Sequence, residues 1–339
     1  MLALARSTSL RHPSGVVLKT PLLVPSFSSK GLRQTKKGRS ELSAVFRNSA
    51  SVLTETMLIS AYDVHYRHLP RPERFPATAT LTFVDSGGYE TGSDYDLSAV
   101  YQYGHAARPW TVQKLRRVLG SWPDYVAAVF VSFDKASAGK SLRVQLRDAR
   151  RLLEDYPTQL HDFLIKPRRG SGHRISGMLN DIRANASEFA RFNVVGVTEK
   201  DLGSSALERI STIAQLRTVL DEAGITAPVQ VFGALDPVAS PLYFLAGAEI
   251  FDGLTWLRFA YVEHQCVYHQ NYGILRVGID PHDDFVRTKM LSDNYASLRN
   301  LQLAMHRFVV DRDFGHFGPH AEPLRRAYES LEARMKGAG

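Results

Sequence analysis

The chain has 339 residues, of which 44% are hydrophobic and 22% are charged, so it is long and apolar enough for a sizeable folded core. A single cysteine, Cys266, excludes an internal disulfide framework and fits a reducing, cytoplasmic compartment. No apolar run reaches the length that crosses a bilayer, so we expect no membrane partner.

The first forty residues carry much of the formal net charge of +8, because they hold eight Lys or Arg residues and no acidic residue before Glu41. Three explanations stay open. A cationic segment suits a polyanion such as nucleic acid. Its first residues also resemble an organellar targeting segment. Finally, basic termini are often solvated and frayed. We expect residues 1–16 to form a basic, flexible N-terminus.

Short apolar runs bounded by turn residues predict eight strands along the chain. These strands are expected at residues 21–25, 57–62, 79–84, 125–131, 162–165, 192–197, 229–232 and 249–251. Helical spacing predicts helices near residues 111–119, 141–154, 206–223 and 241–246.

Most of the strands are continuously apolar, which is typical of a parallel sheet covered on both faces. Eight such units predict an α/β fold, a (β/α)8 TIM barrel over residues 17–282, with a helical C-terminal segment, residues 283–339, packed on it. An open doubly wound sheet is the alternative, but no Gly-x-Gly-x-x-Gly follows the first strand.

Polar residues follow several of these strands, and a barrel brings such residues to one face. They are Asp85, Asp134, Lys166, Glu199, Asp236 and Asp252. Carboxylates gathered at one mouth raise one another's pKa and can divide acid, base and nucleophile roles. Some of them can instead form structural ion pairs with basic neighbours. By local pattern alone, Asp252 before Gly253 is equally well explained as the cap of a turn.

The segment Asp85-Ser86-Gly87-Gly88-Tyr89-Glu90 resembles a motif of the tRNA-guanine transglycosylase (queuine/archaeosine tRNA-ribosyltransferase) family, which has Asp-Ser-Gly-Gly-aromatic-Gln after its third strand. Phe251-Asp252 is similar to the segment that carries that family's nucleophile, and Phe133-Asp134 to one that recognises the base. The strand at residues 193–197 is similar to the family's glycine-rich strand. The resemblance covers about residues 21–310.

This resemblance implies a base exchange in nucleic acid, in which guanine is replaced by a 7-deazaguanine. Asp252 would attack C1′ and form a covalent glycosyl intermediate, while Asp85 would be the general acid and base. Asp134 would accept hydrogen bonds from the base, and Tyr89 and Phe232 would stack on it, although Phe232 is equally well explained by core packing. Further substrate contacts are implied at Gly87, Gly88, Gly196 and Val197.

Two residues depart from the family pattern. Glu90 replaces a glutamine, and Lys166 stands where a base-reading glutamine is expected, so it is expected to pair with a carboxylate or to read a carbonyl group. The basic loop beyond Lys166 is expected to contact phosphate groups, unless it is an ordinary surface loop. The expected nucleic-acid contacts are Arg168, Arg169, Arg174 and Arg258.

The family also has a zinc site made of three cysteines and a histidine. The matching positions here are His264, Cys266, His269 and His306. One thiolate and three imidazoles can hold one structural Zn²⁺ tetrahedrally, and a metal-free packed loop is the alternative. No organic cofactor is expected.

Three classes of function remain. The first is the base exchange, with transfer RNA or DNA as acceptor and a homodimer or an accessory protein as a further partner. The second is a non-catalytic barrel that binds a 7-deazaguanine or a partner, for example in a DNA-modification or phage-defence system. The third is an unrelated barrel aldolase or phosphosugar enzyme, which would need a strand-end lysine, and Lys166 alone qualifies.

Overall fold

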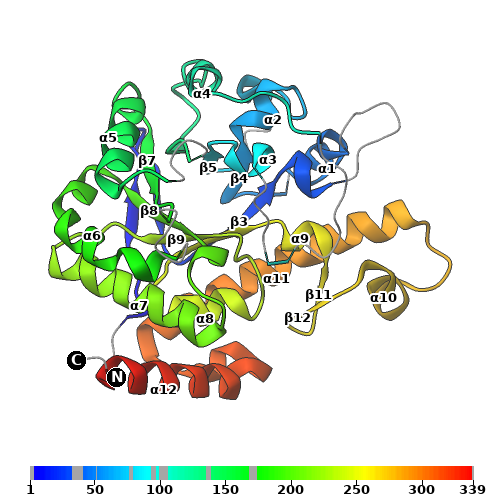
Figure 1. Cartoon of the computed structure of the whole chain (residues 1–339). Helices are drawn as coiled ribbons and strands as arrows, with labels where there is room; N and C mark the ends of the chain where they lie inside the picture. Colours follow the sequence, from blue (N-terminus) through cyan, green and yellow to red (C-terminus); the bar gives the residue numbers. More distant parts are fainter. Residues whose placement is uncertain are drawn as a thin grey trace.

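A computed structural model describes residues 4–32, 41–50, 52–75, 79–92, 97–98, 106–134, 139–167 and 174–337. Its centre is a closed barrel of eight parallel strands, in the order β10-β3-β4-β5-β6-β7-β8-β9 (Figure 1). The strands are β3 (Leu22–Phe27), β4 (Thr56–Ser60), β5 (Leu81–Asp85), β6 (Ala128–Val131), β7 (Leu160–Leu164), β8 (Val194–Thr198), β9 (Val229–Phe232) and β10 (Ile250–Gly253). The predicted (β/α)8 barrel and its eight strands are therefore confirmed.

Helices follow the strands and surround the barrel (Figure 1). They are α1 (Leu42–Ser49), α2 (Ala61–His65), α3 (Gly88–Thr91), α4 (Val112–Leu119), α5 (Leu142–Leu153), α6 (Leu179–Ala184), α7 (Ala206–Glu222), α8 (Ala239–Leu245) and α9 (Thr255–Arg258). The longest of these, α7, begins at a capping box in which Ser205 accepts from the Glu208 N–H and the Glu208 side chain accepts from the Ser205 N–H.

The strand side chains alternate between two apolar layers. Residues such as Val24, Phe83 and Val129 belong to the layer inside the barrel, while their neighbours Leu23 and Val84 belong to the layer between the strands and the helices. Because both layers are apolar, the strands read as continuous hydrophobic runs in the sequence. Polar residues such as Asp85 and Asp252 lie towards the carboxyl ends of the strands, where a pocket opens.

The N-terminal segment differs from the expectation. Strands β1 (Ser9–Arg11) and β2 (Val17–Lys19) form an antiparallel hairpin, and Leu10, 4% exposed, joins the apolar layer inside the barrel. Leu4 and Ala5 are buried as well. The prediction of a flexible segment over residues 1–16 is therefore wrong for residues 4–16, because their apolar side chains cover barrel surface.

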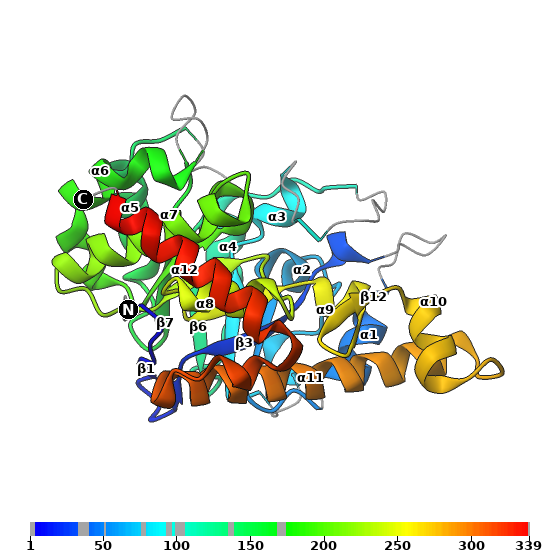
Figure 2. The same ribbon diagram turned by 90° about the horizontal axis from the view of Figure 1, so that it is seen from below.

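The C-terminal part begins with the hairpin β11 (Ala260–Val262) and β12 (Gln265–Val267), which leads to α10 (His269–Tyr272) and a π-helical turn (Gly273–Val277). Two long helices, α11 (Asp283–Asp311) and α12 (Ala321–Gly337), then pack on the barrel, as the sequence predicts (Figure 2). Among the described residues, no helix combines the length and apolar character needed to cross a membrane.

Candidate active site

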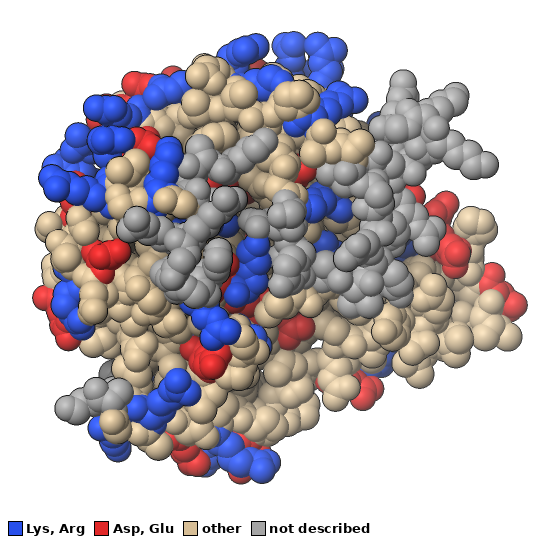
Figure 3. Space-filling model, viewed as in Figure 1, with Lys and Arg blue, Asp and Glu red and all other residues tan. Residues whose placement is uncertain are grey.

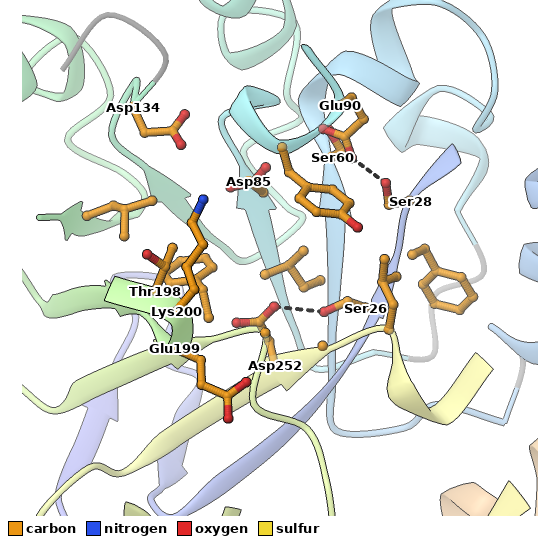
Figure 4. A pocket seen from close by; sticks show the side chains of 18 of the residues that line it. Ser26, Ser28, Ser60, Asp85, Glu90, Asp134, Thr198, Glu199, Lys200 and Asp252 are labelled. Carbon is orange, nitrogen blue, oxygen red and sulfur yellow. Dashed lines mark hydrogen bonds between the residues drawn. The ribbon is translucent and has the colours of Figure 1, made fainter. Parts of the chain in front are cut away.

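A pocket opens at the carboxyl ends of the barrel strands and holds about 730 Å³ of space, part of it open to solvent (Figure 4). Seven of the predicted residues line it: Asp85, Tyr89, Asp134, Lys166, Glu199, Phe232 and Asp252. The lining also includes residues that were not predicted there, namely Ser26, Ser28, Ser60, Thr198 and Lys200.

Asp252 lies in β10 and points into this pocket (Figure 4). The Ser26 hydroxyl donates to its Oδ2 atom at 3.0 Å, and the Gln230 amide donates to its Oδ1 atom at 3.1 Å. Ser26 comes from β3, which pairs with β10 where the barrel closes, and Gln230 comes from β9 on the other side. Two neutral donors thus satisfy the charged form of a carboxylate that is only 5% exposed.

Asp85 is the last residue of β5. Its Oδ2 atom accepts from the Gly87 N–H at 3.0 Å, in a turn where Gly87 has a φ of 86°, a backbone conformation that favours glycine. Burial, and then repulsion from Asp134 and Glu90, raise the pKa of Asp85 to about 8, although Gly87 and Lys166 oppose the shift. Asp85 therefore carries a proton at neutral pH.

Asp134 follows β6 and accepts a hydrogen bond from the Ser86 hydroxyl at 2.6 Å. The Lys166 Nζ atom lies 3.4 Å from its other oxygen, and both side chains are almost fully buried. A Cβ atom at Gly88 would lie 1.9 Å from the Asp134 Oδ1 atom, so only glycine fits there. Of the two roles left open for Lys166, pairing with a carboxylate is therefore realised.

Two further buried acids are Glu90, which lines the pocket, and Asp63, which does not. The Ser28 and Ser60 hydroxyls donate to the two oxygens of Glu90, at 2.5 and 2.7 Å. The Ser29 N–H donates to Asp63 at 2.8 Å. Burial, and then repulsion from Asp85, raise the pKa of Asp63 to about 7, although Ser29 opposes the shift. Burial, and then repulsion from Asp63, raise the pKa of Glu90 to about 7. The serine donors explain how a glutamate is accommodated at the position where the related motif has glutamine.

The two predicted stacking residues, Tyr89 and Phe232, both line the pocket. The Lys30 Nζ atom lies 4.4 Å from the centre of the Tyr89 ring, and Arg258 donates to the Tyr89 hydroxyl at 3.2 Å. Phe232 packs over Gly196, where an added Cβ would come within 2.7 Å of its ring.

Four predicted substrate contacts do not line the pocket: Gly87, Gly88, Gly196 and Val197. Gly87 and Gly88 instead shape the turn and leave room for Asp134, as described above. Gly196 makes room for Phe232, and Val197 belongs to the outer apolar layer, so its side chain faces the helices. In the structure these residues support the pocket from behind its wall.

The other strand-end acids have structural partners. The Tyr243 hydroxyl donates to Glu199 at 2.6 Å and itself accepts from Arg209. Asp236 does not line the pocket: it accepts from the Val238 and Ala239 N–H groups at 2.8 Å and so caps the start of α8.

Of the predicted nucleic-acid contacts, Arg258 lies next to the pocket through Tyr89. Arg174 instead pairs with Glu208 at 3.0 Å, on the first turn of α7. Arg168 and Arg169 lie outside the described residues. Sequence reasoning missed Lys200, which follows Glu199 at the end of β8 and points its amine into the pocket (Figure 4).

The structure does not bring the predicted zinc ligands together. The described residues contain no group of three or more His, Cys, Asp or Glu side chains arranged to bind a metal. The Cys266 thiol donates to Asp236 at 3.2 Å, and burial together with Asp236 raises its pKa. His306 lies on α11 near Glu55 and Arg299, and His269 near Asp283 and Arg287. These residues do not fit a zinc site.

Comparison with protein-family models and with curated proteins finds no match to this chain. The fold and the site therefore define its class: a TIM barrel with a carboxylate-lined pocket at the carboxyl ends of its strands.

Proposed function

We propose that the protein exchanges a base in nucleic acid, replacing guanine by a 7-deazaguanine as members of the tRNA-guanine transglycosylase family do. The observation that carries the proposal is the unequal state of two carboxyl groups in one pocket. Burial and repulsion from Asp134 and Glu90 raise the pKa of Asp85, which favours its protonated form, whereas Asp252 accepts a hydrogen bond on each oxygen. An acid and a nucleophile are the two groups that such a displacement needs.

In the first step, a carboxylate oxygen of Asp252 forms a bond to C1′ of the target nucleotide while the bond from C1′ to guanine breaks. The proton of Asp85 moves to the leaving guanine, so that Asp85 becomes a carboxylate. In the second step, Asp85 removes a proton from the incoming 7-deazaguanine, whose nitrogen attacks C1′ and releases Asp252. Both residues return to their starting states.

The base would lie between Tyr89 and Phe232, and such stacking contributes about 1–3 kcal/mol per base. Asp134 and Lys166 would face its edge. Because Lys166 already offsets the charge of Asp134, the pair presents both an ammonium donor for a carbonyl group and a carboxylate acceptor for N–H groups. This differs from an amide and a free carboxylate, so the base accepted here can differ from that of the related family.

The acceptor would have to release its target base from stacking, which favours a single-stranded or looped segment. Lys and Arg side chains gather over α4 and α5 on the face seen in Figure 3. Exposed residues of α5 in this surface are Arg143, Arg147, Arg150 and Arg151. A basic surface of this kind suits the phosphates of transfer RNA or DNA.

The test is a transfer assay with labelled guanine and, separately, labelled 7-deazaguanine. The protein is incubated with tRNA, single-stranded DNA or duplex DNA, and label in the recovered nucleic acid is measured. The expected result is incorporation into one acceptor class, with a covalent protein–nucleic acid adduct after denaturation. Replacing the acceptor by a polyanion without bases, such as heparin, is the matched control for electrostatic binding.

The second candidate is a barrel that binds a 7-deazaguanine without turnover. One feature favours it: the Lys166–Asp134 ion pair, which satisfies the base-reading carboxylate inside the protein. It is the correct alternative if the protein binds the labelled base, yields no adduct with any acceptor, and binds equally well after Asp252→Ala.

A further inference from the structure

Beneath the pocket, one layer of the barrel interior contains residues from four consecutive strands. Asp162 comes from β7, Gly196 from β8, Gln230 from β9 and Asp252 from β10. Gly196 pairs with Gln230 in the sheet, and Gln230 pairs with Ile250 beside Asp252. A Cβ atom at Gly196 would lie 3.0 and 3.4 Å from the two Asp162 oxygens. The Asp162 carboxyl group therefore occupies, together with the Phe232 ring, the space that the missing side chain of Gly196 leaves, and Gln230 is the strand partner of Gly196 on the side away from β7.

Asp162 and Gln230 are both fully buried, and each has polar atoms without a hydrogen-bond partner among the described residues. For Asp162 these atoms are both carboxyl oxygens, and for Gln230 the Oε1 atom. Three buried acceptors without a donor are costly, because such groups lose their hydration and gain nothing in return. A proton on Asp162 would change one of these acceptors into a donor.

The charges around Asp162 favour that proton. Burial raises the pKa of Asp162 well above its usual value, and Asp252 and Asp85 raise it further. The Gly196 N–H faces Asp162 without the geometry of a regular hydrogen bond; it acts in the opposite direction and is outweighed. Asp252 on β10 and Asp85 on β5 are the ionisable groups that act on it across the barrel.

We infer that Asp162 is a neutral carboxylic acid that donates to the Gln230 Oε1 atom, directly or across one buried water, and so orients the amide that donates to Asp252. Gln230 can present either its NH₂ group or its oxygen to Asp252, and only the NH₂ group attracts a carboxylate. A protonated Asp162 on the opposite side of the amide holds the Gln230 Oε1 atom towards itself. The Gln230 NH₂ group then points towards the Asp252 Oδ1 atom. Asp162 is thus a positioning residue that acts on Asp252 through Gln230.

The neutral state of Asp162 can be tested without any assumption about activity. Urea unfolding is measured from pH 5 to pH 8 for wild type, Asp162→Asn and, as an exposed control, Asp280→Asn. An acid protonated only in the folded state loses stability with rising pH, and asparagine does not. The ratio of the folding equilibrium constant of Asp162→Asn to that of wild type should therefore increase by up to about tenfold for each unit by which the pH rises. Asp280→Asn should follow wild type, and a constant ratio between Asp162→Asn and wild type would overturn the inference.

The link to Gln230 is tested by a double-variant cycle with Asp162→Val and Gln230→Leu, again on stability. The two effects should be non-additive, because either variant removes the same contact. Additive effects would refute the contact.

The effect on Asp252 rests on the proposed function and is read from base exchange. Asp162→Asn, which keeps a donor, should retain the rate within about threefold, whereas Asp162→Val and Gln230→Leu should each lower kcat on the order of tenfold with KM little changed. An Asp162→Asn enzyme as slow as Asp162→Val would show that the charge matters, which contradicts the inference. If wild type exchanges no base, the proposed function fails, and the unfolding experiments still decide the state of Asp162.

Discussion

The mouth of the barrel and the hairpin arm β11–β12 with α10 were both expected to hold a site, and only the mouth assembles one. At the mouth, each strand end delivers its side chain to a common centre, because hydrogen bonding between neighbouring strands fixes where every strand stops. In the arm, His264, Cys266 and His269 are carried by a short hairpin and a short helix, and no shared frame directs them to one point. The spacing of residues along the sequence therefore predicts a site only where the fold brings their side chains to one place.

The largest expected effect concerns Asp252. Asp252→Ala should reduce base exchange by at least about a thousandfold, because the group that forms the covalent intermediate is gone. Asp236→Asn is the matched control, since Asp236 lies in the loop after β9 and does not line the pocket. Rates are measured by incorporation of labelled base. Equal losses in both variants would mean that general damage to the mouth, and not a nucleophile, is being observed.

Asp85→Asn should lower the rate by about a hundredfold to ten-thousandfold, the usual contribution of a general acid. In wild type, the rate should fall as the pH rises through about 8, because the acid then loses its proton. A pH–rate profile from pH 6 to pH 10 tests this. A rate that keeps rising through pH 9 would contradict the assignment of Asp85 as the acid.

Gly88→Ala tests how tightly the mouth is built. The new Cβ atom would overlap the Asp134 carboxyl group, so either the turn or the Lys166–Asp134 pair has to move. Such overpacking costs about 1–3 kcal/mol, measurable by urea unfolding. The control is Gly224→Ala, where no atom lies within 4 Å of the added Cβ and only the positive φ of 71° opposes the change. A smaller loss at Gly88 than at Gly224 would refute the tight packing.

Glu90→Gln should have a smaller effect that depends on pH. The charge of Glu90 raises the pKa of Asp85, so its removal should lower that pKa and move the alkaline fall of exchange to lower pH. The pKa of Glu90 is also raised in the folded protein, from its ordinary value of 4.5 to about 7. The folded protein therefore loses stability as the pH rises from about 4.5 through about 7. The variant should therefore unfold less readily than wild type at pH 8. An unchanged pH–rate profile would show that Glu90 does not influence Asp85.

The smallest effect is expected in the arm. Cys266→Ser keeps a donor for Asp236 and should change the free energy of unfolding by no more than about 0.5 kcal/mol. Elemental analysis should find less than about a tenth of an equivalent of zinc, because a structural zinc binds tightly enough to survive purification. One equivalent of zinc in wild type that is absent from Cys266→Ser would show that the arm binds zinc through Cys266. The arm would then hold a site, as the mouth does.

The barrel was predictable because a strand covered on both faces has to be apolar along its whole length, and eight such runs are visible in the sequence. Asp85 and Asp252 were recognisable from their motifs. Asp162, by contrast, lies inside an ordinary strand segment, and nothing in its neighbours separates it from a surface aspartate. The short polar residues Ser26 and Ser60 gave no signal either, since their importance depends on which acid they face.

By itself, the sequence determined the number and order of the barrel strands, and hence the face on which the residues that follow them gather. Only the tertiary structure decided how those residues share protons and partners. Lys166 pairs with Asp134, burial and neighbouring acids raise the pKa of Asp85, and Asp162 lies fully buried beneath Asp252. The reason is that strand formation depends on local side-chain pattern, whereas burial and the distance between charges depend on residues that are far apart along the chain.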